Sequence, residues 1–165
     1  MNYTADGEFN TALVSPVSKK NWRTQVQYKV NPSVSIRYRL DAMWYDLKGP
    51  LESRGFLTFF DIFYKPERKK FSGNLRLQYF ETDNYDSRIY AYENDVLYGF
   101  SIPAFSGKGY RYYINMEFDL GKAFSVWVKW AQTLFLGKKY AELGGGQANE
   151  GSGTDFRIQF RYIFQ

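Results

Sequence analysis

Residues 34–44 read VSIRYRLDAMW, and their side chains alternate between two kinds. The odd positions from 35 to 41 carry Ser, Arg, Arg and Asp. The even positions carry the apolar residues Val34, Ile36, Tyr38, Leu40, Ala42 and Trp44. Because successive side chains of a strand point to opposite faces, this period of two predicts a β-strand with one apolar and one polar face.

The same alternation recurs along the chain, at 22–30, 56–64, 71–79, 88–100, 110–120, 124–133 and 156–164. It is weaker at 56–64 and ambiguous at 88–100, whose sequence is RIYAYENDVLYGF. The five prolines lie before or between these runs, and proline cannot donate to a strand ladder. The sequence therefore predicts an all-β chain of about eight strands, longer than the strands of most soluble sheets.

Composition removes most catalytic chemistry. The chain has 165 residues, a net charge of +5 and 21% aromatic residues, and it contains neither histidine nor cysteine. Imidazole-dependent catalysis, thiol nucleophiles and His or Cys metal sites are thereby excluded. We expect no enzymatic activity, no cofactor and no metal, and the modest charge of mixed sign does not indicate a nucleic-acid partner.

The size of the aromatic side chains predicts which face points outward. The interior of an eight-stranded barrel is just wide enough for its own side chains, so it cannot hold this many aromatic rings. We therefore expect an antiparallel up-and-down transmembrane β-barrel with its apolar face outward in lipid and a polar lumen. Aromatic side chains of such barrels gather at the lipid–water boundaries. The girdle candidates are Tyr28, Trp44, Tyr64, Tyr79, Tyr98, Tyr110 and Tyr162.

Charged side chains on the opposite positions are expected to point into the lumen. In a narrow lumen such groups must pair or be hydrated. The favoured interpretation is a structural network of ion pairs that plugs the lumen. The alternatives are a selectivity surface for a small polar solute and, more remotely, a catalytic carboxylate pair such as Asp41 with Asp61. The predicted network comprises Arg23, Arg37, Arg39, Asp41, Asp61, Arg76, Glu93, Asp95, Arg111, Glu117, Lys129, Arg157 and Arg161.

Two segments resemble a known family. They are RIYAYENDVLYGFSIPAFSGKG (88–109), within the longer match 83–120, and TDFRIQFRYIF (154–164). With the intervening chain, from Trp22 to Phe164, they are similar to the C-terminal barrel of Bacteroidetes outer-membrane proteins. Those proteins are usually described as helix-hairpin-helix domain-containing, and their function is unassigned.

The resemblance implies an outer-membrane location and assembly by the barrel-assembly machinery. Phe160, Tyr162 and Phe164 resemble the terminal signal that this machinery reads, although Gln165 follows the last phenylalanine. The helical region that gives the family its name has no counterpart here, so no DNA-linked role is carried over.

The predicted organisation is a barrel over residues 20–165, with a long glycine-rich loop at 137–153. Residues 1–19 form an N-terminal extension or, through EFNTALVS (8–15), an extra strand, and they lack the features of a signal peptide. The orientation of the first strands is left open. If 88–100 is a simple membrane crossing, the tight turns near 31–33 and 65–70 fall on the side where long loops are usual.

The expected function is that of a bacterial outer-membrane barrel with a structural or interaction role and a mostly plugged lumen. Its expected partners are membrane lipid, or detergent in its place, and the assembly machinery. One alternative is a pore for small polar solutes, formed by a larger or self-associated barrel. A second alternative is a soluble β-barrel or β-sandwich that acts as a binding module.

Overall fold

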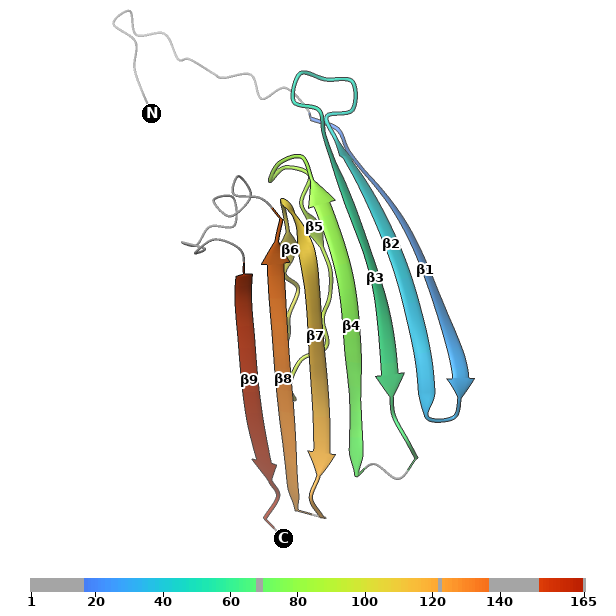
Figure 1. Ribbon diagram of the computed structural model, residues 1–165, viewed down its shortest axis with the longest axis vertical. Coiled ribbons are helices and arrows are strands. Elements are labelled where there is room, and N and C mark those ends of the chain that lie inside the picture. The colour runs from blue at the N-terminus through green and yellow to red at the C-terminus, as the bar shows by residue number, and fades with distance from the viewer. Residues whose placement is uncertain (1–16, 68–69, 122, 137–151, 165) are drawn as a thin grey trace, which may run out of the picture.

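The structure, a computed structural model, describes residues 17–67, 70–121, 123–136 and 152–164. These residues form an antiparallel sheet of seven long strands in the order β1-β2-β3-β4-β7-β8-β9 (Figure 1). A separate pair of short strands, β5 and β6, accompanies it. The long strands are β1 (Lys19–Asn31), β2 (Val34–Tyr45), β3 (Ser53–Tyr64), β4 (Phe71–Thr82), β7 (Lys108–Asp119), β8 (Phe124–Phe135) and β9 (Ser152–Tyr162). The described segments contain no helix, and hence none that is long and apolar enough to span a membrane.

The ambiguous run at 88–100 is not a membrane-length strand, so the prediction of eight strands is wrong at this point. Residues 83–107, which we call the connection, join β4 to β7 and contain only β5 (Ile89–Tyr90) and β6 (Ala104–Phe105). Figure 1 shows the connection running alongside the sheet instead of extending it. The reason is chemical, because Glu93 and Asp95 in this run bind cationic side chains of the sheet.

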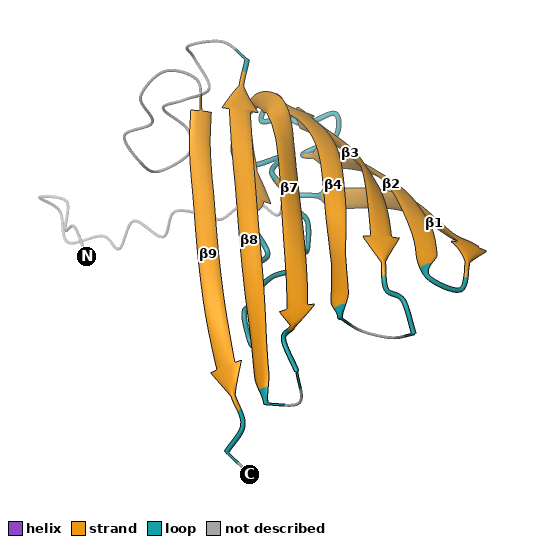
Figure 2. Cartoon of the chain, turned by 60° about the horizontal axis from the view of Figure 1, so that its bottom comes forward, coloured by secondary structure: helices purple, strands orange, loops and turns teal. Residues whose placement is uncertain are grey.

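The two faces of the curved sheet (Figure 2) differ in the way that the alternation predicts. We call the face with the even residues of β1 to β3 the apolar face, and the opposite one the polar face. The apolar face exposes large side chains on every long strand, among them Trp22, Val26, Tyr38, Phe60, Ile62, Leu77, Tyr110, Trp130, Phe156 and Ile158. The connection packs on the central part of the polar face, whereas the polar-face residues of β1 are exposed.

A small hydrophobic core lies between the connection and the polar face. Leu57, Phe59 and Phe80 of the sheet are nearly inaccessible and pack with Ile89 and Phe105 of the connection. Leu57 and Phe59 belong to the run at 56–64, where the alternation is weak. The alternation is weak there because Leu57 and Phe59, on the polar face, pack against the connection, while the even residues of the run belong to the apolar face.

The links between consecutive strands are distributed over the two ends of the sheet. The short links β1–β2, β3–β4 and β7–β8 lie at the same end as the C-terminus, whereas β2–β3 and the long connection lie at the other (Figure 1). Since residues 88–100 do not cross, the turns near 31–33 and 65–70 share the end of the 120–123 turn. The difficulty over the orientation of the first strands therefore disappears.

No closed barrel is formed by the described residues. β1 pairs only with β2 and β9 only with β8, so both strands leave one edge free within the part of the chain that the structure describes. β9 begins at Ser152, which places the last two residues of the predicted loop 137–153 in a strand. The remainder of that loop and the predicted extra strand at 8–15 lie outside the described residues.

Candidate functional site

The polar face carries a belt of ion pairs that begins near the β1 edge. Asp41 on β2 accepts hydrogen bonds from Arg23 Nε at 2.5 Å and Arg39 Nε at 2.6 Å. Arg39 Nη2 also donates to the carbonyl of Tyr90 at 3.4 Å, which links this first cluster to the connection. Strands β1 and β2 pair Arg23 with Asp41, and this register places the two side chains on one face.

The second cluster lies at the centre of the belt. Asp61 is fully buried and accepts hydrogen bonds from Arg37 at 2.5 and 2.8 Å and from Arg76 at 2.6 and 2.9 Å. Arg76 is also fully buried, lies 3.6 Å above the ring of Phe59, and donates to the carbonyl of Tyr92 at 2.7 Å. Two guanidinium groups thus share one buried carboxylate, and the buried charges of Asp61 and Arg76 require such partners.

The third cluster fixes the connection to strands β7, β8 and β9. Arg111 holds the buried Glu93 through two hydrogen bonds, of 2.5 and 2.9 Å, and Lys129 Nζ lies 3.1 Å from the same carboxylate. Asp95 lies 2.5 Å from Arg157 and 3.5 Å from Lys129. Glu93 and Asp95 of the connection are therefore neutralised by cations of the sheet.

The structure brings most of the predicted lumen residues together in these three clusters. Arg23, Arg39 and Asp41 form the first; Arg37, Asp61 and Arg76 the second; Glu93, Asp95, Arg111, Lys129 and Arg157 the third. Two predicted members lie apart. Glu117 accepts a hydrogen bond from Ser72 at 3.0 Å, and Arg161 donates to Ser125 at 3.1 Å beside the ring of Trp127.

Asp41 and Asp61, the carboxylates weighed as a pair from the sequence, belong to two different clusters. Each is bound to two arginines of its own cluster, and neither donates to or accepts from the other. Both carboxylates are held by arginine side chains, which suits a structural role.

Aromatic side chains lie along the whole apolar face: some pack near the two ends of the strands, and Tyr112 and Trp130, with ring centroids 5.6 Å apart, lie between those ends. We call the end of the sheet with the β1–β2, β3–β4 and β7–β8 links the turn end, and the opposite end the loop end. At the turn end Phe71 packs against Tyr64 and Phe118, with ring centroids 5.8 and 5.1 Å apart. Towards the loop end Tyr79 packs against Phe56 and Tyr110, with ring centroids 6.4 and 5.2 Å apart. On β4, Phe71 and Tyr79 are eight residues apart, which corresponds to about 26 Å along a strand.

Six of the seven predicted girdle residues lie on long strands, at positions that the alternation assigns to the apolar face. They are Tyr28, Trp44, Tyr64, Tyr79, Tyr110 and Tyr162. Tyr98 does not belong with them. It lies in the connection, with a φ of 63° and a side chain that is 88% exposed, because the run around it is not a crossing.

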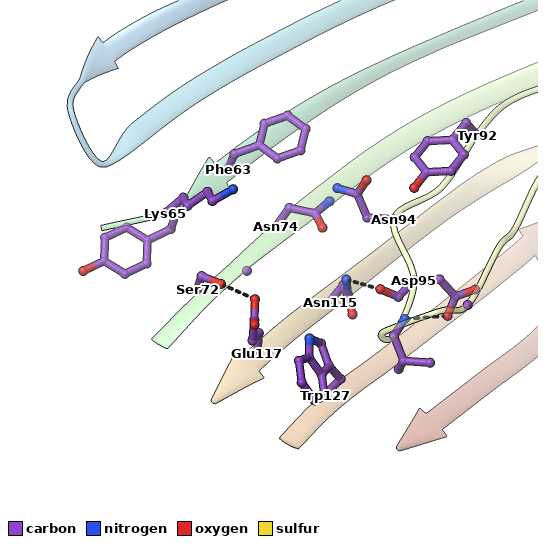
Figure 3. Close-up of a pocket in the computed structure, with 14 residues that line it drawn as sticks. Phe63, Lys65, Ser72, Asn74, Tyr92, Asn94, Asp95, Asn115, Glu117 and Trp127 are labelled. Atoms are coloured by element: carbon purple, nitrogen blue, oxygen red, sulfur yellow. Dashed lines mark hydrogen bonds between the residues drawn. The ribbon is translucent and has the colours of Figure 1, made fainter. Parts of the chain in front are cut away.

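A cleft of about 380 Å³ opens on the polar face near the turn end (Figure 3). The side chains of Asn74 and Asn94 lie between the rings of Phe63 and Tyr92, and Asn115, Glu117 and Trp127 line the other side. Asn115 Nδ2 donates to the carbonyl of Asp95 at 3.0 Å, while its buried Oδ1 has no hydrogen-bond partner.

Sequence reasoning did not identify this cleft, because part of its lining, from Tyr92 to Gly99, comes from the connection. Asn74 and Asn115 sit on polar positions of their strands, where asparagine gives no signal beyond solvation. Only the fold shows that Tyr92 and Asn94 lie above them. Among the described residues, no group of three or more Asp, Glu, His or Cys side chains is placed to hold a metal ion.

Comparison of the chain with protein-family models, with curated proteins and with solved structures finds no match.

Proposed function

We propose that this chain is part of the wall of a bacterial outer-membrane β-barrel. Its apolar face would contact lipid, and its polar face would line a lumen that the connection largely fills. The observation that carries the proposal is the continuous apolar face, which exposes large side chains on all seven long strands. Soluble monomeric proteins rarely expose apolar patches beyond a few hundred Å².

Three further features support a membrane setting. From Phe71 to Tyr79 the apolar side of β4 extends over about 26 Å of strand, and the apolar band of an outer-membrane barrel is about 25 Å tall. The links 32–33, 65–70 and 120–123 lie at one end and the much longer connection, 83–107, at the other, and outer-membrane barrels likewise have short turns on one side and longer loops on the other. The C-terminal strand ends with Phe160 and Tyr162 on the apolar face, in line with the proposed role of this strand in assembly.

The soluble alternative finds less support. A soluble sandwich needs a second sheet to cover the apolar face. Among the described residues the only other strands are β5 and β6, and the connection that carries them packs on the polar face. The apolar face thus has no protein cover within these residues.

The connection also bears on the size of the barrel. An eight-stranded barrel has room inside only for its own side chains. Here the polar face holds a whole chain segment, with Leu57, Phe80 and Ile89 packed between it and the sheet. A wall that encloses this segment needs more strands than the seven described. The additional strands would also pair with the free edges of β1 and β9, because backbone groups at an open edge cannot be satisfied in lipid. Among the alternatives given above, the packed connection favours a barrel of more than eight strands. While the connection stays in place it fills the lumen, and the barrel then has a structural or interaction role.

Folding in detergent tests the membrane assignment. The chain, refolded into lauryldimethylamine oxide micelles, should show strand-rich circular dichroism and a gel mobility that changes on boiling. In buffer without detergent it should aggregate. A folded, soluble monomer in plain buffer would refute the proposal.

A pair of matched substitutions provides a sharper test. Leu75→Arg puts a charge midway between Phe71 and Tyr79 of β4, on the apolar face, whereas Leu51→Arg puts the same charge on an exposed link. If the face contacts lipid, Leu75→Arg should cost about 2–4 kcal/mol of unfolding free energy in bilayers. Leu51→Arg should stay within about 0.5 kcal/mol. Equal, small effects would show that the face does not contact lipid.

A further inference from the structure

The cleft at the turn end has a size and lining that suit a small ligand. Its volume of about 380 Å³ falls in the range of roughly 300–1,000 Å³ for small-molecule sites. It is built by four strands together with residues of the connection, so it exists only while the connection is docked. Figure 3 shows polar side chains on both sides of it and aromatic rings at its margins.

The charges around the cleft favour a neutral ligand. Asp95 is already neutralised by Lys129 and Arg157. That leaves one carboxylate, Glu117, and one ammonium group, Lys65, among the lining side chains. A polyanion would need several free cations and a divalent metal several free carboxylates, and the described lining offers neither.

The hydrogen-bonding groups favour a ligand with hydroxyl groups. Asn115 lines the cleft, but its unpaired Oδ1 is closed to solvent, so the groups open to a ligand are the other polar side chains of the lining. Glu117 receives only the Ser72 hydroxyl bond within the described residues, so it can accept a second donor. The Asn74 and Asn94 amides can both donate and accept, as a hydroxyl does.

The aromatic margins favour a ligand that also has an apolar face. Phe63 and Tyr92 flank the two asparagines (Figure 3), and Trp127 closes the opposite side. A sugar ring presents C–H groups on its faces and hydroxyl groups around its rim. From this combination we propose that the cleft is a binding site for a neutral saccharide of one or two rings.

Titration of the refolded protein tests the site. The micelles must be made of lauryldimethylamine oxide, because a glycoside detergent would compete. We expect maltose or N,N′-diacetylchitobiose to bind with a millimolar or lower dissociation constant, measured by calorimetry and by tryptophan fluorescence. Inorganic phosphate and Ca²⁺ should not bind. Absence of saccharide binding, or binding of phosphate or Ca²⁺ in its place, would overturn the proposal.

Variants place the binding in the cleft. Glu117→Gln and Asn94→Ala should each weaken saccharide binding at least tenfold, and Gln159→Ala, on the polar side of β9 outside the cleft, should leave it unchanged. Heat-modifiable gel mobility reports folding of each variant independently of binding. Saccharide affinity that stays unchanged in both cleft variants would overturn the assignment. Because the gel reads out barrel folding and calorimetry reads out the site, failure of this inference and failure of the membrane assignment remain distinguishable.

Discussion

At the scale of a single residue, Asp61 is the acceptor on which the central ion-pair cluster depends. Its carboxylate is fully buried and is the shared acceptor for Arg37 and Arg76. Without this negative charge, Arg76 would be left buried with the Tyr92 carbonyl and the rings of Phe59 and Tyr113 as partners, none of which carries a charge. The residue therefore determines whether two cations can remain inside.

We predict that Asp61→Asn lowers the free energy of unfolding by about 3–5 kcal/mol, because it leaves buried cations without their counter-charge. Urea titration of the refolded protein in micelles, followed by circular dichroism, measures the change. The control is Asp155→Asn, whose carboxylate pairs with Arg111 but is 50% exposed, and which should cost less than about 1 kcal/mol. Similar costs for the two variants would contradict a buried central cluster.

A second residue-scale prediction concerns the compensating change. In Asp61→Asn combined with Arg76→Met, the buried charge at position 76 is gone and an apolar chain lies over Phe59. Replacing a buried ion pair by apolar side chains is often close to neutral. The double variant should therefore recover a large part of the stability lost in Asp61→Asn, in the same urea titration. A loss equal to or larger than that of the single variant would show that Arg76 acts through other contacts.

At the scale of an element, the connection depends on one close approach to the sheet. A Cβ built on Gly55 of β3 would lie 2.3 Å from the carbonyl oxygen of Ser87. The backbones of β3 and the connection are thus in direct contact, and Ser87 itself is fully buried. Glycine is needed here for space.

We predict that Gly55→Ala displaces the connection near Ser87, at a cost of about 1–3 kcal/mol. Hydrogen exchange of residues 87–93, measured by mass spectrometry, should increase. Gly153→Ala is the matched control, because a Cβ at that glycine of β9 meets nothing within 4 Å. If exchange in the connection is the same in both variants, the contact at Ser87 does not hold it in place.

The same element shows how far the sequence alone could lead. Alternation located the seven long strands to within a few residues, because their two faces have environments of opposite polarity. It failed at 88–100, where the positions of Glu93 and Asp95 are fixed by ion pairs with cations on β7, β8 and β9. These cations lie up to 62 residues away along the chain. It also gave no sign of the cleft, since Asn94 and Asn115 meet only through the docking of the connection. Local pattern predicts elements, and long-range pairing builds the site.

For the whole molecule, the fold predicts which ends share a side of the membrane. Ser33, Lys70 and Gly121 lie at links on the C-terminal end of the sheet, and Lys48 and Tyr85 lie at the other end.

We therefore expect Ser33→Cys and Lys70→Cys to be shielded in intact cells from a membrane-impermeant maleimide, and Lys48→Cys and Tyr85→Cys to react. The natural chain lacks cysteine, so it provides a background without labelling. Permeabilised cells should label all four, as the control for accessibility. Labelling of Ser33→Cys and Lys48→Cys from the same side would contradict a membrane-spanning sheet.

The free edges of the sheet have a consequence of parity. Seven strands that alternate in direction begin and end with the same direction, so β1 and β9 are parallel to each other. Direct closure of β1 on β9 would make one parallel seam, and a ring of two copies in the same orientation would make two. A ring of antiparallel neighbours alone needs equal numbers of ascending and descending strands. The complement that closes such a ring around this sheet must therefore supply an odd number of strands, and the strands it sets against β1 and β9 must both run opposite to them.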